Sequence, residues 1–435
     1  MNASKYLVAD GNNVSIGSVS LERLKQDFGT PLYVVDEQDF IDRAKVFKDN
    51  FKSSKFETRI LYASKAFTNL YMAGLVDSLG LYTDVVSGGE IYISLKAGEK
   101  AKNLYFHGNN KLRSELEQAV DADLGTIVID NECEYELLNE ILKEKNKKQA
   151  CLLRINPSID AHTHKYIQTG GDDSKFGMSV HLEQTKELIK KISKNQNFDF
   201  RGFHCHIGSQ IHDEKFFFFE VAVMLKYAKD IENNLNIKIR EMNFGGGFGV
   251  YYTSEDKPFD LETFLQRYAE KIEEKLLNLD MNLETVSIEP GRSLINQSIT
   301  MLYEVGVIKT TSTGLNYIFV DGGMTDNIRP ALYGAKYEAF IANKISEEPT
   351  TKYTIAGKCC ESGDILVKDV MLPKASAGDL LMIPNAGAYT YAMASNYNKL
   401  SKPAVVFVKN AKAKLAVRRQ SFEDLVSNDE VYKNE

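Results

Sequence analysis

The sequence predicts an α/β protein built from an eight-stranded parallel (β/α)8 barrel and a separate C-terminal β domain. Between residues 59 and 292, eight short β-rich runs alternate with longer segments whose apolar residues recur at helical spacing. Glycine and polar residues follow the ends of these runs, where the loops of a parallel barrel carry their chemistry. After Arg292, short β runs and turn signals continue without alternating helical segments.

Each predicted barrel strand is a short apolar run that ends at a turn signal. The segments between them, such as 131–147, 182–193 and 261–277, place apolar residues on one helical face and Lys and Glu on the other. Eight such units close into a TIM-type barrel of about 250 residues. The predicted strands are residues 59–63, 81–86, 103–107, 126–130, 151–156, 201–206, 241–245 and 285–289.

The length of 435 residues favours two domains, because a single core rarely keeps growing beyond about 300 residues. We expect residues 36–290 to form the barrel and residues 291–435 to form a β barrel or sandwich. Residues 1–35 are expected to add strands to the β domain. The predicted strands of this domain are residues 301–309, 316–321, 353–356, 380–383 and 404–408.

The charge and cysteine content exclude several classes of protein. With 53 basic and 60 acidic residues the formal charge is −7, and no basic block is present to follow a nucleic acid. No apolar stretch is long enough to cross a bilayer and the start lacks an apolar leader, so a soluble cytoplasmic protein is expected. Five cysteines at spacings that fit no zinc site indicate reduced thiols and no metal centre.

A lysine, Lys65, follows the first predicted strand. Its amine can form a Schiff base with pyridoxal phosphate, provided that other residues hold the phosphate and the ring. Gly246 and Gly247, in a glycine-rich turn, and Ser209 offer backbone N–H groups and a hydroxyl for phosphate oxygens. The alternatives are a solvated lysine and a turn that only punctuates the chain.

The eighth predicted strand ends in Glu289, whose carboxylate can hold the proton of a pyridine nitrogen. Arg292, three residues later, can bind a phosphate or a substrate carboxylate with its planar guanidinium. His206 can stack on a cofactor ring, which would direct the neighbouring Cys205 to the opposite face of the strand. A core histidine is the alternative for both His204 and His206.

Six motifs in this order resemble the signature set of the alanine-racemase-fold, pyridoxal-phosphate-dependent decarboxylases. They are residues 62–65 (YASK), 206–210 (HIGSQ), 245–249 (GGGFG), 289–292 (EPGR), 360–364 (CESGD) and 387–389 (GAY). The resemblance runs nearly end to end and includes Thr169-Gly170 as well as residues 174–177 and 328–333.

The resemblance implies a pyridoxal 5'-phosphate enzyme that forms a homodimer, with each active site shared between two chains. Lys65 would carry the cofactor, His206 would stack on it, and Cys360 from the partner chain would donate a proton to the substrate carbon. The implied cofactor-binding residues are Lys65, His206, Ser209, Gly246, Gly247, Glu289, Arg292 and Tyr389. The implied substrate-binding residues are Arg292, Arg329, Tyr333, Glu361 and Tyr389.

The charges expected at the far end of the substrate favour one substrate. A buried Arg329 beside Glu361 suits a molecule with both a carboxylate and an amine at its far end, as in meso-2,6-diaminopimelate. The expected reaction is decarboxylation to L-lysine and carbon dioxide, the last step of lysine biosynthesis. Tyr333 is expected to assist Arg329, whose alternative role is a structural ion pair.

Three other functions remain open at this point. A decarboxylase of the same family could act on ornithine, lysine, arginine or carboxynorspermidine. A racemase is less favoured, because racemases of this fold pair the ring nitrogen with Arg, where this chain has Glu289. A non-catalytic barrel that carries the cofactor or binds partners is disfavoured by the presence of both Lys65 and Cys360.

Overall fold

The structure is a computed structural model that describes residues 3–159 and 174–432. The chain divides into two compact units. The first comprises the described residues of 1–42, 251–256 and 295–435, and the second comprises those of 43–250 and 257–294. The motif residues Thr169 and Gly170 lie outside the described residues.

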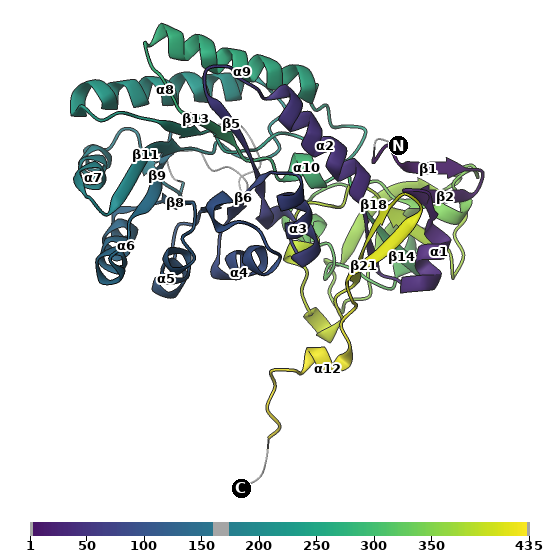
Figure 1. Ribbon diagram of the computed structural model, residues 1–435. Helices are drawn as coiled ribbons and strands as arrows, with labels where there is room; N and C mark the ends of the chain where they lie inside the picture. Colours follow the sequence, from purple (N-terminus) through teal and green to yellow (C-terminus); the bar gives the residue numbers. More distant parts are fainter. Residues whose placement is uncertain (1–2, 160–173, 433–435) are drawn as a thin grey trace. The chain divides into compact units, whose positions relative to one another are not determined.

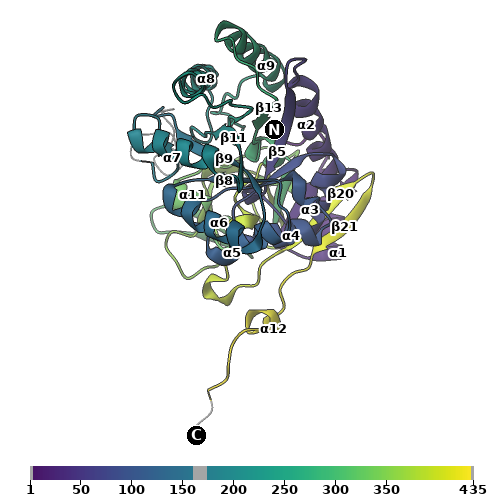
Figure 2. The same ribbon diagram turned by 60° about the vertical axis from the view of Figure 1, so that its left-hand side comes forward.

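The second unit is a closed barrel of eight parallel strands, which confirms the predicted fold class (Figures 1 and 2). Every strand pairs in parallel with the next one around the barrel, and the pairing of β8 with β9 closes the ring. The strands are β5 (Glu57–Ala63), β6 (Tyr82–Val85), β7 (Leu104–Phe106), β8 (Thr126–Ile129), β9 (Gln149–Asn156), β11 (Phe198–His204), β12 (Glu241–Asn243) and β13 (Thr285–Ile288). All eight predicted strand positions are confirmed.

Helices connect these strands and lie outside them (Figures 1 and 2). Several begin at a residue whose side chain accepts a hydrogen bond from the first turn, as Asn69, Ser87, Asn131 and Asp260 do. The helices are α2 (Glu37–Asn50), α3 (Leu70–Ser78), α4 (Gly88–Lys96), α5 (Arg113–Asp121), α6 (Glu132–Lys145), α7 (Glu183–Lys194), α8 (Lys215–Leu235) and α9 (Leu261–Asn278). Helices α8 and α9 run side by side and pack through aromatic rings such as Phe217 and Phe264.

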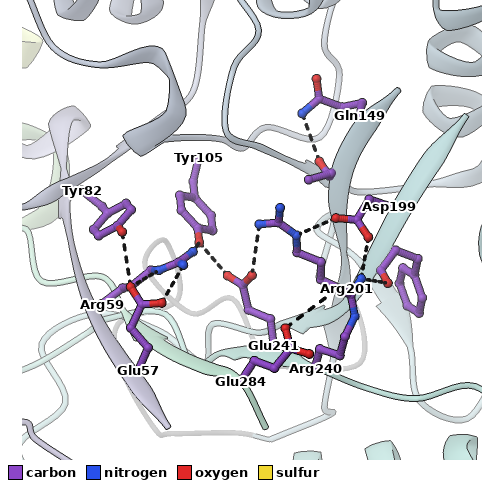
Figure 3. Close-up of polar contacts among 12 residues, drawn as sticks. Glu57, Arg59, Tyr82, Tyr105, Gln149, Asp199, Arg201, Arg240, Glu241 and Glu284 are labelled. Carbon is purple, nitrogen blue, oxygen red and sulfur yellow. Dashed lines mark hydrogen bonds and ion pairs between the residues drawn. The ribbon is translucent and has the colours of Figure 1, made fainter. Parts of the chain in front are cut away.

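The barrel interior has an apolar layer and a polar amino-terminal end. Leu61, Tyr105, Val128 and Leu152 pack together inside the barrel. At the strand starts, polar side chains join several strands into one network (Figure 3). Its labelled members are Glu57, Arg59, Tyr82, Tyr105, Asp199, Arg201, Arg240, Glu241 and Glu284, while Gln149 bonds separately to the backbone carbonyl oxygens of Leu124 and Ala150. This network closes the end of the barrel that lies opposite the loops expected to carry the chemistry.

The first unit is built on a nine-stranded mixed sheet. Strand β4 (Leu32–Asp36) pairs with both β14 and β20. Apolar residues from both ends of the chain, such as Leu32, Leu302 and Val406, share one core. The other strands are β14 (Ile299–Thr310), β15 (Asn316–Val320), β16 (Phe340–Ile341), β17 (Thr351–Ala356), β18 (Ile365–Leu372), β19 (Leu380–Ile383), β20 (Ala404–Lys409) and β21 (Lys412–Val417).

The remaining elements are short. Strands β1 (Leu7–Asp10), β2 (Asn13–Ile16) and β3 (Val19–Ser20) form a three-stranded antiparallel sheet. Strand β10 (Met178–Ser179) extends the barrel sheet beside β9, and the short helices are α1 (Leu21–Phe28), α10 (Arg292–Ile295), α11 (Arg329–Tyr333) and α12 (Phe422–Leu425). Among the described residues, no helix is both long enough and apolar enough to span a membrane.

Candidate active site

Lys65 stands in a short 3-10 turn, Ser64–Ala66, directly after β5. Its Nζ lies 2.5 Å from Oδ2 of Asp84, a fully buried carboxylate on the neighbouring strand β6. The Lys65 side chain is 38% exposed, so its amine remains accessible to a ligand. The structure therefore places the lysine at the carboxyl end of the barrel, with an anion fixed beside it.

Glu289 follows β13 and is held by side chains from three other strands. Its Oε1 accepts a hydrogen bond from Asn243 Nδ2 at 2.7 Å and lies 2.9 Å from His107 Nε2, while its Oε2 lies 3.3 Å from His204 Nε2. Burial raises the pKa of Glu289, but the interactions with His107 and His204 outweigh this and hold it well below the usual carboxyl value. Glu289 is thus a buried anion at neutral pH.

Two histidines at the carboxyl end of β11, His204 and His206, are both uncharged. Burial lowers the pKa of His204 to about 4. Burial, together with the positive charges of Lys65 and Arg154, holds the pKa of His206 well below the usual imidazole value. His206 is only half-buried and its Nδ1 accepts a hydrogen bond from the backbone N–H of Gly246 at 3.2 Å. A neutral imidazole fixed in this way can lie flat against an aromatic ring.

The glycine-rich turn packs against the loops that follow the neighbouring strands. A Cβ added at Gly246 would lie 2.1 Å from the carbonyl oxygen of Glu289, and one added at Gly247 would lie 2.3 Å from that of Gly208. Gly247 also has φ +109°, a conformation that side chains rarely adopt. Only glycine therefore lets these loops approach one another so closely.

Ser209 and Arg292 lie together at the same end of the barrel. The guanidinium of Arg292 donates to Ser209 Oγ from Nη2 at 3.1 Å and from Nε at 3.3 Å. Arg292 is buried, with 7% exposure, while Ser209 is half-buried. A guanidinium next to a hydroxyl is a donor set that suits a phosphate group.

These residues fit pyridoxal phosphate. Lys65 supplies an accessible amine, Glu289 a buried anion for a protonated ring nitrogen, and Ser209 with Arg292 a donor set for phosphate. The ligand atoms of His107, His204 and Glu289 also lie within 4.8 Å of one another, an arrangement that could hold a metal ion.

Arg329, in the other unit, is a buried cation that contacts aromatic rings. It begins α11 and is 6% exposed; its Cζ lies 4.5 Å from the ring centroid of Tyr252, and Nη1 donates to the hydroxyl of Tyr337. Among the described residues it has no carboxylate partner, and its buried Nε has no hydrogen-bond acceptor. The described contacts of Arg329 are with Tyr252 and Tyr337; Tyr333, at the end of α11, is half-buried.

Cys360 and Glu361 lie on an exposed turn between β17 and β18. The buried carboxylate of Asp364 holds this turn, since its side-chain oxygens accept from the backbone N–H groups of Met324 at 2.6 Å and Cys359 at 2.8 Å. The Cys360 N–H donates to Asn398 Oδ1 at 2.7 Å. Tyr389 is half-buried and has φ +61°, an uncommon backbone conformation for a non-glycine residue.

Sequence reasoning did not select two residues that shape the barrel part of the site: Asp84 and Asn243. Asp84 and Asn243 are buried polar residues on short barrel strands. A buried polar residue of this kind usually has a specific partner. That pattern could have singled them out. Their partners could not be predicted, because the contacts depend on which strands lie opposite each other in the closed barrel. The prediction that Cys205 points away from His206 agrees with its contact to α8.

Comparisons with known proteins point to one family. The family model for the pyridoxal-binding domain of pyridoxal-dependent decarboxylases matches residues 37–296. The diaminopimelate decarboxylase of Bacillus subtilis (strain 168) is 44% identical over 421 residues, which cover 97% of this chain and 96% of the relative. That of Staphylococcus aureus (strain COL) is 41% identical over 417 residues, covering 96% of this chain and 97% of the relative.

A solved structure agrees with the sequence relatives. The diaminopimelate decarboxylase of M. jannaschii in complex with L-lysine superimposes with a TM-score of 0.92 at 30% identity and covers 99% of both chains.

Proposed function

Because the chain belongs to the diaminopimelate decarboxylase family of pyridoxal-dependent decarboxylases, we propose that it converts meso-2,6-diaminopimelate to L-lysine and carbon dioxide. This reaction is the last step of lysine biosynthesis. The observation that carries the proposal is the position of Lys65, an accessible amine at the barrel end that also holds Glu289, His206 and Arg292.

Bound pyridoxal phosphate supplies an aromatic system that accepts the electrons of the breaking carbon–carbon bond. Lys65 would attach the cofactor through its side-chain nitrogen, and the ionised Glu289 would pair with a protonated ring nitrogen. His206 would present a neutral ring surface to the cofactor. Ser209, Gly246, Gly247 and Arg292 would hold the phosphate. Burial of Glu289 among His107, His204 and Asn243 keeps this carboxylate in one orientation.

The substrate is recognised at both ends. Arg329 binds the far carboxylate, which would satisfy a guanidinium that has no anionic partner among the described residues. Glu361 binds the far ammonium group, with Tyr333 and Tyr389 beside the substrate. Cys360 gives its thiol proton to the α carbon after carbon dioxide leaves. The carboxyl group is lost from the D-configured centre.

We further propose that two chains form a homodimer with shared sites. Cys360 and Glu361 lie on an exposed turn, which leaves their side chains available to a second copy of the chain. A cytoplasmic location is part of the same proposal, since the five free cysteines would stay reduced there.

A decarboxylation assay tests the proposed function. Carbon dioxide release is measured with meso-diaminopimelate, L-lysine and L-ornithine, with and without added pyridoxal phosphate. Only meso-diaminopimelate should react. Lys65→Ala should remove the visible absorbance of the bound cofactor and lower turnover by at least about 10³-fold, as expected for loss of a covalent catalyst. Reaction with ornithine or lysine alone, or full activity of Lys65→Ala, would refute the proposal.

A further inference from the structure

A buried acid, Glu220, lies directly behind the cofactor-facing residues of β11. It stands on α8, is 0% exposed, and its Oε1 accepts a hydrogen bond from Cys205 Sγ at 3.2 Å. Cys205 is equally buried and occupies the position between His204 and His206. Successive residues of a strand point to opposite faces, so Cys205 faces the helix layer while the two histidines face the site.

The contact is also linked to Glu289 through the next strand. The backbone N–H of Cys205 donates to the carbonyl oxygen of Asn243 at 2.9 Å, and the Cys205 thiol lies 3.8 Å from the same oxygen. The side chain of Asn243 in turn donates to Glu289 Oε1 at 2.7 Å. The end of β11, the end of β12 and Glu289 thus form one connected set of hydrogen bonds, and Glu220 meets it from outside the barrel.

Among the described residues, no cation acts on Glu220 to balance a negative charge. The titratable groups that act on it are the Cys205 thiol and Glu289, while Tyr268 of α9 is a further buried neighbour whose own charge state Glu220 influences. Burial raises the pKa of Glu220 well above the usual carboxyl value, which favours the neutral acid over the carboxylate. A neutral acid can keep its hydrogen bond without adding a second negative charge behind Glu289.

We propose that Glu220 is a positioning residue whose buried carboxyl group holds Cys205 against α8 and thereby fixes the orientation of His204 and His206 toward the cofactor. The inference rests on the proposed function, because it concerns the same cofactor site. An outer partner of this kind limits how far a binding residue can move, and its loss weakens ligand affinity without removing a direct contact.

The experiment measures the dissociation constant of pyridoxal phosphate, by visible absorbance, in apoenzyme prepared from the wild type and five variants. Glu220→Ala and Cys205→Ala should each raise the constant on the order of 10-fold and shift the absorbance of the bound cofactor. The double variant should be no weaker than either single variant, because both changes remove the same interaction. Glu220→Gln should behave like the wild type, since an uncharged amide still accepts from the thiol.

Met224→Ala is the matched control, because Met224 is fully buried one turn further along α8. It should lower thermal stability about as much as Glu220→Ala does while leaving cofactor affinity and absorbance unchanged. Infrared difference spectra of wild type and Glu220→Gln should differ by the band of a protonated carboxyl group.

Four results would overturn the inference: wild-type affinity in Glu220→Ala or Cys205→Ala, additive effects in the double variant, a loss in Glu220→Gln equal to that of Glu220→Ala, or the same loss in Met224→Ala. If Glu220→Ala does not fold, the cofactor affinities of Cys205→Ala and Glu220→Gln still test the inference. Failure of the wild type itself to bind pyridoxal phosphate would instead overturn the proposed function, and this inference with it.

Discussion

Arg329 is a buried cation without a carboxylate partner among the described residues. Its guanidinium lies against the rings of Tyr252 and Tyr337, which stabilise a cation, and Nη1 donates to the Tyr337 hydroxyl, but the buried Nε has no acceptor. If it binds the far carboxylate of the substrate, Arg329→Met should raise KM for meso-diaminopimelate by about 10- to 100-fold, the equivalent of one lost charge-assisted interaction. Absorbance of the bound cofactor should stay unchanged. Steady-state kinetics and spectra check both expectations.

Lys336→Gln provides a control from the same segment, since it removes an exposed cation whose described partner is Glu255 at the surface. Its KM should match that of the wild type. An unchanged KM in Arg329→Met would assign Arg329 a structural role.

Glu99 makes stability depend on pH. Burial raises its pKa to about 7 from the ordinary 4.5, although hydrogen bonds from Thr83 and Ser94 offset part of this effect. The folded state therefore favours the neutral acid. The stability that this preference contributes is fully present below pH 4.5 and is lost as pH rises through 7. The loss amounts to about 3 kcal/mol at most.

Urea unfolding between pH 5 and pH 8 tests this pH dependence. Glu99→Gln should be less sensitive to pH over this range than the wild type, because the amide does not titrate. Glu347→Gln, at an exposed carboxyl, should retain the wild-type dependence. A wild-type pH profile in Glu99→Gln would show that another group causes it.

At the scale of the elements, the polar network at the strand starts lies at the end of the barrel opposite the proposed site. Tyr105 of β7 links two charged residues there, accepting from Arg59 Nη1 at 2.7 Å and donating to Glu241 Oε1 at 2.6 Å (Figure 3). Tyr105→Phe removes the shared hydroxyl, and it should lower the free energy of unfolding by about 1–3 kcal/mol because buried polar groups lose a partner. Cofactor affinity should not change, because the hydroxyl lies at the opposite end of the strands.

Tyr82→Phe is the comparison for that variant, since the Tyr82 hydroxyl makes a single 3.4 Å contact with Glu57. Its unfolding free energy should stay within about 0.5 kcal/mol of wild type. Denaturant unfolding combined with a cofactor titration separates the two effects. Weaker cofactor binding in Tyr105→Phe would show that the two ends of the barrel are coupled.

Strands that are more deeply buried were easier to predict from the sequence. Barrel strands such as β8 are buried on both faces and read as continuous apolar runs, so the sequence located all eight. Strands β18 and β21 were not predicted, because exposed residues such as Lys368 and Lys412 interrupt their apolar pattern. The domain boundaries at residues 35/36 and 290/291 remain proposals.

The site could be predicted only where a motif named its residue. Lys65, His206, Glu289 and Arg292 all follow strand ends, and their convergence required no more than the barrel rule. Asp84, by contrast, contacts Lys65 because β5 and β6 are neighbours in a particular register. Such registers are fixed by tertiary packing, which local sequence patterns do not encode.

At the scale of the whole molecule, the proposed homodimer with shared active sites can be tested by mixing two inactive variants. Lys65→Ala removes the cofactor-binding amine, while Cys360→Ala removes the proton donor on the exposed turn. If each site takes Lys65 from one chain and Cys360 from the other, a mixed dimer has one intact site. Random exchange of subunits should then restore about a quarter of the wild-type activity. Turnover measured before and after mixing, with light scattering to establish the dimer mass, checks this expectation.

A mixture of Lys65→Ala with the double variant carrying both changes should stay inactive, because no pairing of those chains provides both groups. Absence of recovery from the two single variants, in dimers shown to exchange, would place Lys65 and Cys360 of the same chain in each site.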